Sequence, residues 1–93
     1  IQVTNDDKTL IVTAAASDVL FSVDAETGKV LGRAKVGAGP RGVALETDSS
    51  GKNNRAWVLN ALANTVYVVD IANPAKMKAF VPLNFILSTP VNV

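Results

Sequence analysis

The chain has 93 residues, and its nine Lys or Arg against eight Asp or Glu give a formal net charge of +1 at pH 7. Because the two signs are interspersed, there is no electrostatic footprint for a nucleic acid or an anionic membrane surface. Zero Cys and zero His exclude thiolate and imidazole metal ligands, a Cys nucleophile, a C-x-x-C-H haem attachment and a His general base within these residues. We therefore expect no catalytic residue, no cofactor and no metal site in this chain.

Hydrophobic residues make up 48% of the chain, yet no apolar run is long enough to cross a bilayer. No charged segment precedes an apolar one at the start, so the sequence predicts neither a membrane span nor a signal peptide. The chain begins at Ile1, directly in strand-like sequence, which suits a processed product or a piece of a longer polypeptide.

The first 36 residues contain four short apolar segments separated by turn-forming residues. β-branched and aromatic residues are typical of strands, whereas Asn, Asp and Gly favour turns. Gly28 is expected to have a positive φ that closes a hairpin between the third and fourth segments. Arg33 and Lys35 share one face of the fourth segment, as is typical of an exposed sheet edge. The predicted strands are residues 1–3, 10–13, 19–24 and 30–36.

Residues 37–83 repeat this organisation after a crossing loop, Gly37-Ala38-Gly39-Pro40. No helix start and no Lys-Ser or Lys-Thr pair follows these glycines, so they do not predict a phosphate-binding loop. The polar reversal at 46–54 is about four residues longer than its counterpart in the first unit. The predicted strands are residues 42–45, 56–59, 65–69 and 77–83. Residues 84–93 are expected to be a linker or the start of a further strand.

The two units align at a spacing of 46 positions, which places Trp57 on Ile11 and Tyr67 on Phe21. Self-similarity at a period of about 40 to 50 residues, in a unit made of strands only, is typical of β-propeller blades. We predict an all-β fold in which residues 1–36 and 37–83 form two blades, each a four-stranded antiparallel sheet, within a larger propeller. Trp57 and Tyr67 are expected to be core aromatics between blades.

Two blades do not complete a propeller. Each blade is expected to be apolar on both faces because its neighbours cover them, and repeat architectures need three or more units to bury enough surface. The expected partners are therefore further blades, from the same polypeptide or from other copies.

Several motifs resemble the YVTN-repeat family of β-propellers. They are Trp57-Val58-Leu59-Asn60, Asn64-Thr65-Val66, Val68-Val69-Asp70 and the crossing Val36-Gly37-Ala38-Gly39-Pro40-Arg41-Gly42-Val43-Ala44. The first unit departs from the family pattern, with Ile11-Val12-Thr13-Ala14 where a Tyr-Val-Ala-Asn-like strand stands in the family. The resemblance implies a periplasmic, extracellular or cell-surface location. Propellers of this family occur as surface-layer and secreted proteins, as lactonase-like enzymes, and joined to c-type haem peroxidase-like domains.

The strand order of the family places turns 14–18 and 60–64 and the crossing loop 37–41 at one end of the ring. This end is rich in Ala, Gly and Asn, with Asp18 and Arg41 as its charges. Small side chains let another backbone approach, and an Arg binds a carboxylate or phosphate bidentately. The candidate ligand- or partner-binding residues are Arg41, Asn60 and Asn64. The alternative is that the two Asn side chains only bond their own turn.

Two functions follow from this reading of the sequence. The first is a noncatalytic scaffold or binding segment of an extracytoplasmic propeller, whose partner is a redox or cell-surface component. The second is a propeller segment of a redox or lactonase-like enzyme whose catalytic residues lie outside this chain.

Overall fold

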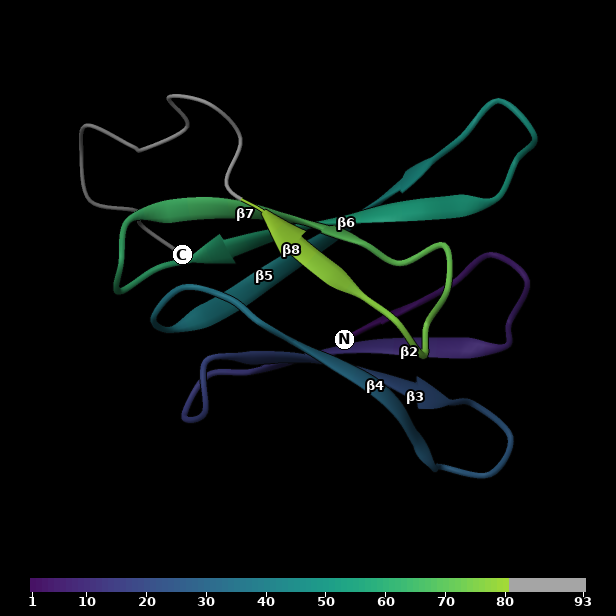
Figure 1. Ribbon diagram of the computed structural model, residues 1–93, viewed down its shortest axis with the longest axis horizontal. Helices are drawn as coiled ribbons and strands as arrows, with labels where there is room; N and C mark the ends of the chain where they lie inside the picture. Colours follow the sequence, from purple (N-terminus) through teal and green to yellow (C-terminus); the bar gives the residue numbers. More distant parts are fainter. Residues whose placement is uncertain (81–93) are drawn as a thin grey trace.

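A computed structural model describes residues 1–80 and shows two four-stranded antiparallel sheets stacked on each other, without helices (Figure 1). The strand order is β1-β2-β3-β4 in the first sheet and β5-β6-β7-β8 in the second. The strands of the first sheet are β1 (Gln2–Val3), β2 (Thr9–Ala14), β3 (Val19–Asp24) and β4 (Val30–Lys35). Those of the second are β5 (Pro40–Thr47), β6 (Asn53–Asn60), β7 (Thr65–Asp70) and β8 (Lys78–Phe80).

The pairing registers confirm that the two sheets repeat one pattern. Ile11 pairs with Ser22 in the first sheet as Trp57 pairs with Val68 in the second, so the spacing of 46 holds for the middle strands. The turn between the first two strands differs in length. Six residues separate the paired Val3 and Leu10, whereas ten separate the paired Leu45 and Ala56, which is the four-residue insertion expected from the sequence.

The core lies between the sheets. Strands alternate their side chains between two faces, and the side chains that the two sheets turn toward each other are mostly apolar, with Thr9 and Ser22 as buried polar exceptions. Buried members of this cluster are Ile11, Leu20, Ala34, Val36, Ala56, Val58, Val69 and Ile71. Tyr67 packs against the cluster, which matches the expected position for an aromatic between sheets.

The turn between β7 and β8 contacts the first sheet at Ser22 and Gly32. The Ser22 hydroxyl, fully buried on β3, donates to the backbone carbonyl of Pro74 at 2.6 Å. Gly32 on β4 faces the same carbonyl, and a Cβ at this position would clash with it. The turn that joins β7 to β8 thus packs against β3 and β4 of the first sheet.

The predicted all-β fold is confirmed, and so is the hairpin between the third and fourth strands, where Gly28 has φ of 75°. Boundaries in the second sheet were wrong: the strand expected at 42–45 is Pro40–Thr47 and the one expected at 56–59 is Asn53–Asn60, because pairing extends from Pro40–Asn60 to Thr47–Asn53. Within residues 1–80 no helix is long and apolar enough to cross a membrane. Predictions for residues 81–83 and 84–93 fall outside the described residues.

Candidate functional site

Three connections meet at one end of the stack, on the left in Figure 1. We call this the loop end, formed by residues 14–18, 36–41 and 61–64. Backbone hydrogen bonds tie the crossing to the turns of both sheets. Ala61 N–H donates to the Gly39 carbonyl at 2.9 Å, Ala63 N–H donates to the Ala38 carbonyl at 3.1 Å, and Val36 N–H donates to the Asp18 carbonyl. The crossing between the two sheets is therefore held from both sides, and the loop end is one continuous surface.

Asp18 organises the first half of this surface. Its backbone lies in the left-handed region with φ of 55°, a conformation that Asp and Asn tolerate better than most residues. Its carbonyl accepts the Val36 N–H at 3.0 Å, and its Oδ1 accepts the Gly39 N–H at 3.1 Å. Asn64, 46 positions later, has φ of 57° in the same place of the second sheet. The repeat thus preserves the backbone conformation of the turn while exchanging the carboxylate for an amide.

Arg41 is exposed at the loop end, on the second residue of β5. The register between β5 and β6 shifts between Pro40 and Gly42, so Arg41 lies at a β-bulge. Bulges change the direction of a side chain relative to the regular pleat. The exposed guanidinium offers a paired set of donors to a carboxylate or phosphate.

Asn60 is fully buried beneath the crossing. Its Nδ2 lies 3.4 Å from the Thr65 hydroxyl, and its Oδ1 has no hydrogen-bond partner. A Cβ on Gly37 would stand 2.9 Å from Asn60 Nδ2, so glycine is needed for the crossing to lie on this amide. The Asn60 side chain thus lies against Gly37 of the crossing. Asn64, half-buried, lies at the end of the turn that joins β6 to β7.

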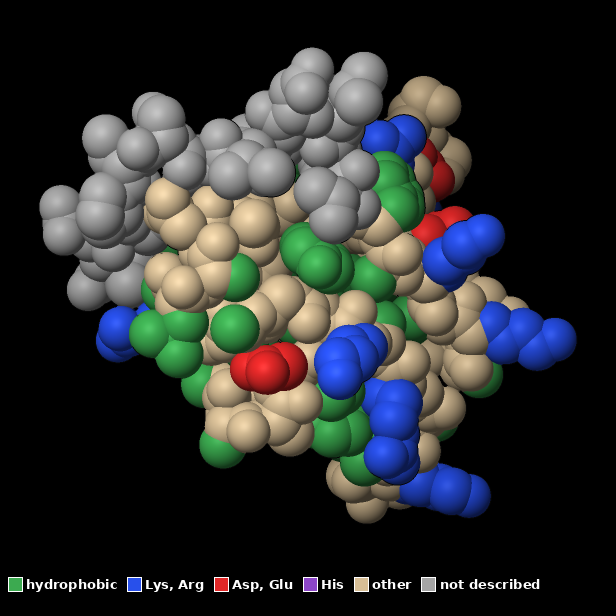
Figure 2. Space-filling view, turned by 60° about the vertical axis from the view of Figure 1, so that its left-hand side comes forward, with side chains coloured by type: hydrophobic (Ala, Val, Ile, Leu, Met, Phe, Trp, Pro, Cys, Tyr) green, Lys and Arg blue, Asp and Glu red, His purple; other side chains and the backbone are tan. Residues whose placement is uncertain are grey.

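Figure 2 brings the loop-end side of the molecule forward and shows how its side chains are distributed. Hydrophobic side chains are interspersed with backbone and uncharged polar side chains in this view, while Lys and Arg side chains project mainly toward its right-hand part. The connections of the loop end carry two charged residues, Asp18 and Arg41, and one large exposed apolar residue, Leu62, among mainly small residues.

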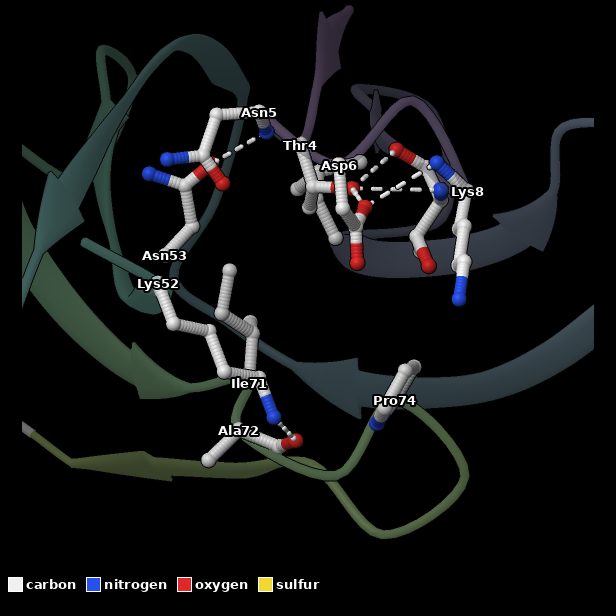
Figure 3. A pocket seen from close by; sticks show the side chains of 11 residues that line it. Thr4, Asn5, Asp6, Lys8, Lys52, Asn53, Ile71, Ala72 and Pro74 are labelled. Atoms are coloured by element: carbon white, nitrogen blue, oxygen red, sulfur yellow. Dashed lines mark hydrogen bonds between the residues drawn. The ribbon is translucent and has the colours of Figure 1, made fainter. Parts of the chain in front are cut away.

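A cleft of about 170 Å³ opens at the opposite end, between the two sheets (Figure 3). Its apolar part is formed by Ile11, Ile71 and Pro74, and its polar part by the turns between the first two strands of each sheet. These turns bond to each other: Asn5 N–H donates to Asn53 Oδ1 at 2.8 Å. The sequence did not indicate this cleft, because it depends on how two sheets pack and has no local pattern.

The turns beside this cleft each contain an aspartate whose carboxylate accepts local hydrogen bonds. The Thr4 hydroxyl donates to Asp6 at 2.6 Å, and this bond, followed by that from Lys8 N–H, lowers the pKa of Asp6 from its ordinary value of 3.8. The Ser50 hydroxyl donates to Asp48 at 2.6 Å and lowers the pKa of Asp48 in the same way. Both carboxylates cap turns, and local bonding explains both pKa shifts.

Among residues 1–80, no group of three or more His, Cys, Asp or Glu side chains could hold a metal ion. The one ion pair found in this part of the chain joins Arg55 to Glu46 at 3.3 Å on the surface of the second sheet, and exposed pairs of this kind contribute little to stability. No protein-family model matches the sequence, and comparison with curated proteins gives no significant match.

Proposed function

We propose that the chain is a noncatalytic scaffold or binding segment of an extracytoplasmic, YVTN-like β-propeller. Further sheets of the same repeat, from the same polypeptide or from other copies, complete the ring. The periplasm, the cell surface or the extracellular medium is the setting of the proposal, and a redox or cell-surface component is the partner class. Support comes from the two stacked four-stranded sheets and from the position of the Gly39-Pro40 and Asn64-Thr65 motifs at the loop end.

One observation carries the binding part of this proposal. The three connections of the loop end are hydrogen-bonded into one surface, and Arg41 projects from a bulge at its margin. Asp18 bonds the crossing through Gly39 N–H, Asn60 is buried beside Gly37, and Arg41 is an exposed cation beside backbone that a partner can approach closely. A carboxylate- or phosphate-bearing group fits this chemistry, because a guanidinium binds such groups bidentately.

An NMR titration of the ¹⁵N-labelled chain with succinate, and separately with inorganic phosphate, tests this site. The amide signals of Gly39, Arg41 and Gly42 are expected to shift, and Arg41→Gln is expected to abolish the shifts. Arg33→Gln is the matched control, since Arg33 is an exposed arginine on the first sheet, 5.6 Å from the centre of the Phe21 ring. Shifts centred on Lys8 and Lys52, beside the cleft, would place the anion site at the wrong end.

The noncatalytic part is tested separately. The chain is expected to leave a simple γ-lactone unhydrolysed in a pH-stat assay. Turnover that Arg41→Gln abolishes would contradict the proposal and assign the chemistry to the loop end.

A further inference from the structure

The first sheet has a largely apolar face that points away from the second sheet, with the exposed Arg33 and Lys35 of β4 at its margin, opposite Phe21 and Val19. Val3, Leu10, Val23 and Val30 form one cross-strand row on this face, and Val12 and Phe21 form the next. None of these six side chains is buried, and Val3 and Val30 are 48% and 47% exposed. We call this surface the open face. A contiguous apolar patch on a protein surface marks an interaction site.

The structure itself shows what covers such a face. The open face matches, pair by pair, the face that the second sheet turns toward the first. The equivalent pairs are Val3–Leu10 and Leu45–Ala56, Val12–Phe21 and Val58–Tyr67, and Val23–Val30 and Val69–Ala79. In the second sheet the central residues Ala56, Val58 and Val69 are fully buried, in one cluster with residues of the first sheet. A face of this repeat is therefore covered by the opposite face of a neighbouring sheet.

The outward face of the second sheet carries Val68 paired with Phe80 where the first sheet has Ser22 paired with Gly32. Val68 is buried, so Phe80 is the exposed member of its pair. Ser22 and Gly32 contact the turn between β7 and β8. This turn is long, because nine residues separate the paired Val69 and Ala79. The equivalent turn beside the open face is shorter, with six residues between Val23 and Val30. A short turn leaves space that a large side chain can fill, and Phe80 is 46% exposed on the outward face.

We propose that the open face binds the outward face of the second sheet of another copy of this chain, around Phe80. The contact joins two different faces, so copies associate head to tail and either close a ring or continue as a chain. Two copies supply four sheets, the smallest number at which propellers close. The inference rests on the proposed function, because it names one source of the further sheets.

Sedimentation equilibrium of the full chain tests the proposal with two complementary variants. Val30→Glu places a charge on the open face, and Phe80→Glu places one on the outward face; both positions are about half exposed, so folding is expected to survive. The unsubstituted chain is expected to associate as its concentration rises, and each variant alone is expected to remain monomeric. An equimolar mixture is expected to form a one-to-one dimer, because each variant retains the face that the other has lost.

Leu62→Glu is the control, since Leu62 is a large apolar residue, 83% exposed, on the loop end. It is expected to associate as the unsubstituted chain does. Circular dichroism and a cooperative unfolding transition verify that each variant is folded, and Val3→Glu and Phe80→Gly replace any variant that is not.

Three results would overturn the proposal: a monomer at every concentration, dimers formed by Phe80→Glu alone, or no dimer in the mixture of folded variants. Dimers of Phe80→Glu alone would mean that two open faces pair with each other. A monomeric chain that still binds succinate through Arg41 would leave the proposed function intact, with the further sheets supplied by the same polypeptide.

Discussion

The two sheets differ most in the turn that joins their third and fourth strands. In the first sheet the turn is closed on itself: Asp24 Oδ1 accepts the N–H groups of Glu26 and Thr27, and Gly28 takes the positive φ. In the second sheet the turn has three more residues between its paired strand ends, Val69 and Ala79, than the first sheet has between Val23 and Val30. Its Pro74 carbonyl accepts a hydrogen bond from Ser22 of the first sheet. The same place in the repeat is a local hairpin in one sheet and an intersheet contact in the other.

This comparison separates what the repeat specifies from what individual residues add. Strand pairing follows the repeat, because apolar and β-branched residues recur at matching positions. The contact of the second sheet's turn with the first sheet depends on single positions, Ser22 and Gly32, whose equivalents in the second sheet are Val68 and Phe80. Four changes test the two kinds of position, from the largest expected effect to the smallest.

Gly32→Ala is expected to have the largest effect. The added Cβ would clash with the Pro74 carbonyl, and this backbone group can only move together with the turn. We expect a loss of about 2 kcal/mol in the free energy of unfolding, the usual size of an overpacking penalty, measured by chemical denaturation. Gly42→Ala is the matched control, because a Cβ there meets Leu59 Cβ at an ordinary 3.6 Å. Equal stability of the two variants would show that the turn does not rest on Gly32.

Ser22→Ala tests the hydrogen bond of the same contact. The variant removes the fully buried hydroxyl that donates to the Pro74 carbonyl at 2.6 Å, and we expect a loss of about 1 to 2 kcal/mol in the free energy of unfolding. Ser17→Ala removes an exposed hydroxyl, 3.4 Å from the Ala14 carbonyl, and is expected to be close to neutral. A neutral Ser22→Ala would mean that this carbonyl finds another donor when the hydroxyl is gone.

The sequence predicted the strands and turns well because each depends on neighbouring residues. Gly28 in its hairpin and the longer turn at 46–54 are examples, since turn chemistry is local. The polar contacts between the sheets were not predicted. Ser22 is an ordinary strand residue in the sequence, and its role appears only when Pro74, 52 positions away, is placed beside it.

The candidate site was predicted in part. The sequence, through the order of strands in the repeat, brought the crossing loop and both turns to one end, and the structure joins them by hydrogen bonds. It could not predict that Asn60 is fully buried while Arg41 is exposed, because burial there depends on how Gly37 lies on the Asn60 amide. The roles of Arg41, Asn60 and Asn64 in binding stay predictions.

Gly28→Ala tests the self-contained turn of the first sheet. No heavy atom lies within 4 Å of an added Cβ, so the cost arises only from the positive φ of 75°. We expect a loss of about 1 kcal/mol in the free energy of unfolding. Gly28→Asn is the informative control, since Asn tolerates the left-handed region and is expected to cost less than Ala. An Asn variant as unstable as the Ala variant would indicate that something other than φ selects glycine here.

The smallest expected effect compares Asp6 and Asp48, which cap the turns between the first and second strands of the two sheets. Hydrogen bonds from Thr4 and Ser50 lower both pKa values below the ordinary 3.8, so these carboxylates prefer the folded, ionised state. Their contribution to stability is therefore complete above the pKa of the unfolded chain and is lost as the pH falls through the lower pKa of the folded chain. We expect the free energy of unfolding to decrease on acidification below about pH 4.

Ser50→Ala sharpens this comparison within one turn. Removing the hydroxyl is expected to raise the pKa of Asp48 toward 3.8 while that of Asp6 stays unchanged, as followed by a ¹³C NMR titration of the carboxyl groups. The neighbouring exposed Ser49 provides the control, because the hydroxyl that donates to Asp48 belongs to Ser50, and Ser49→Ala should leave both pKa values in place. If Ser50→Ala leaves the Asp48 titration unmoved, the backbone N–H groups of Ser50 and Lys52, at 2.9 and 3.0 Å, hold that carboxylate by themselves. The turn with the four-residue insertion would then be capped by backbone alone, whereas the shorter turn of the first sheet, where Asp6 accepts bonds from the Thr4 hydroxyl and the Lys8 N–H, would still depend on a side chain.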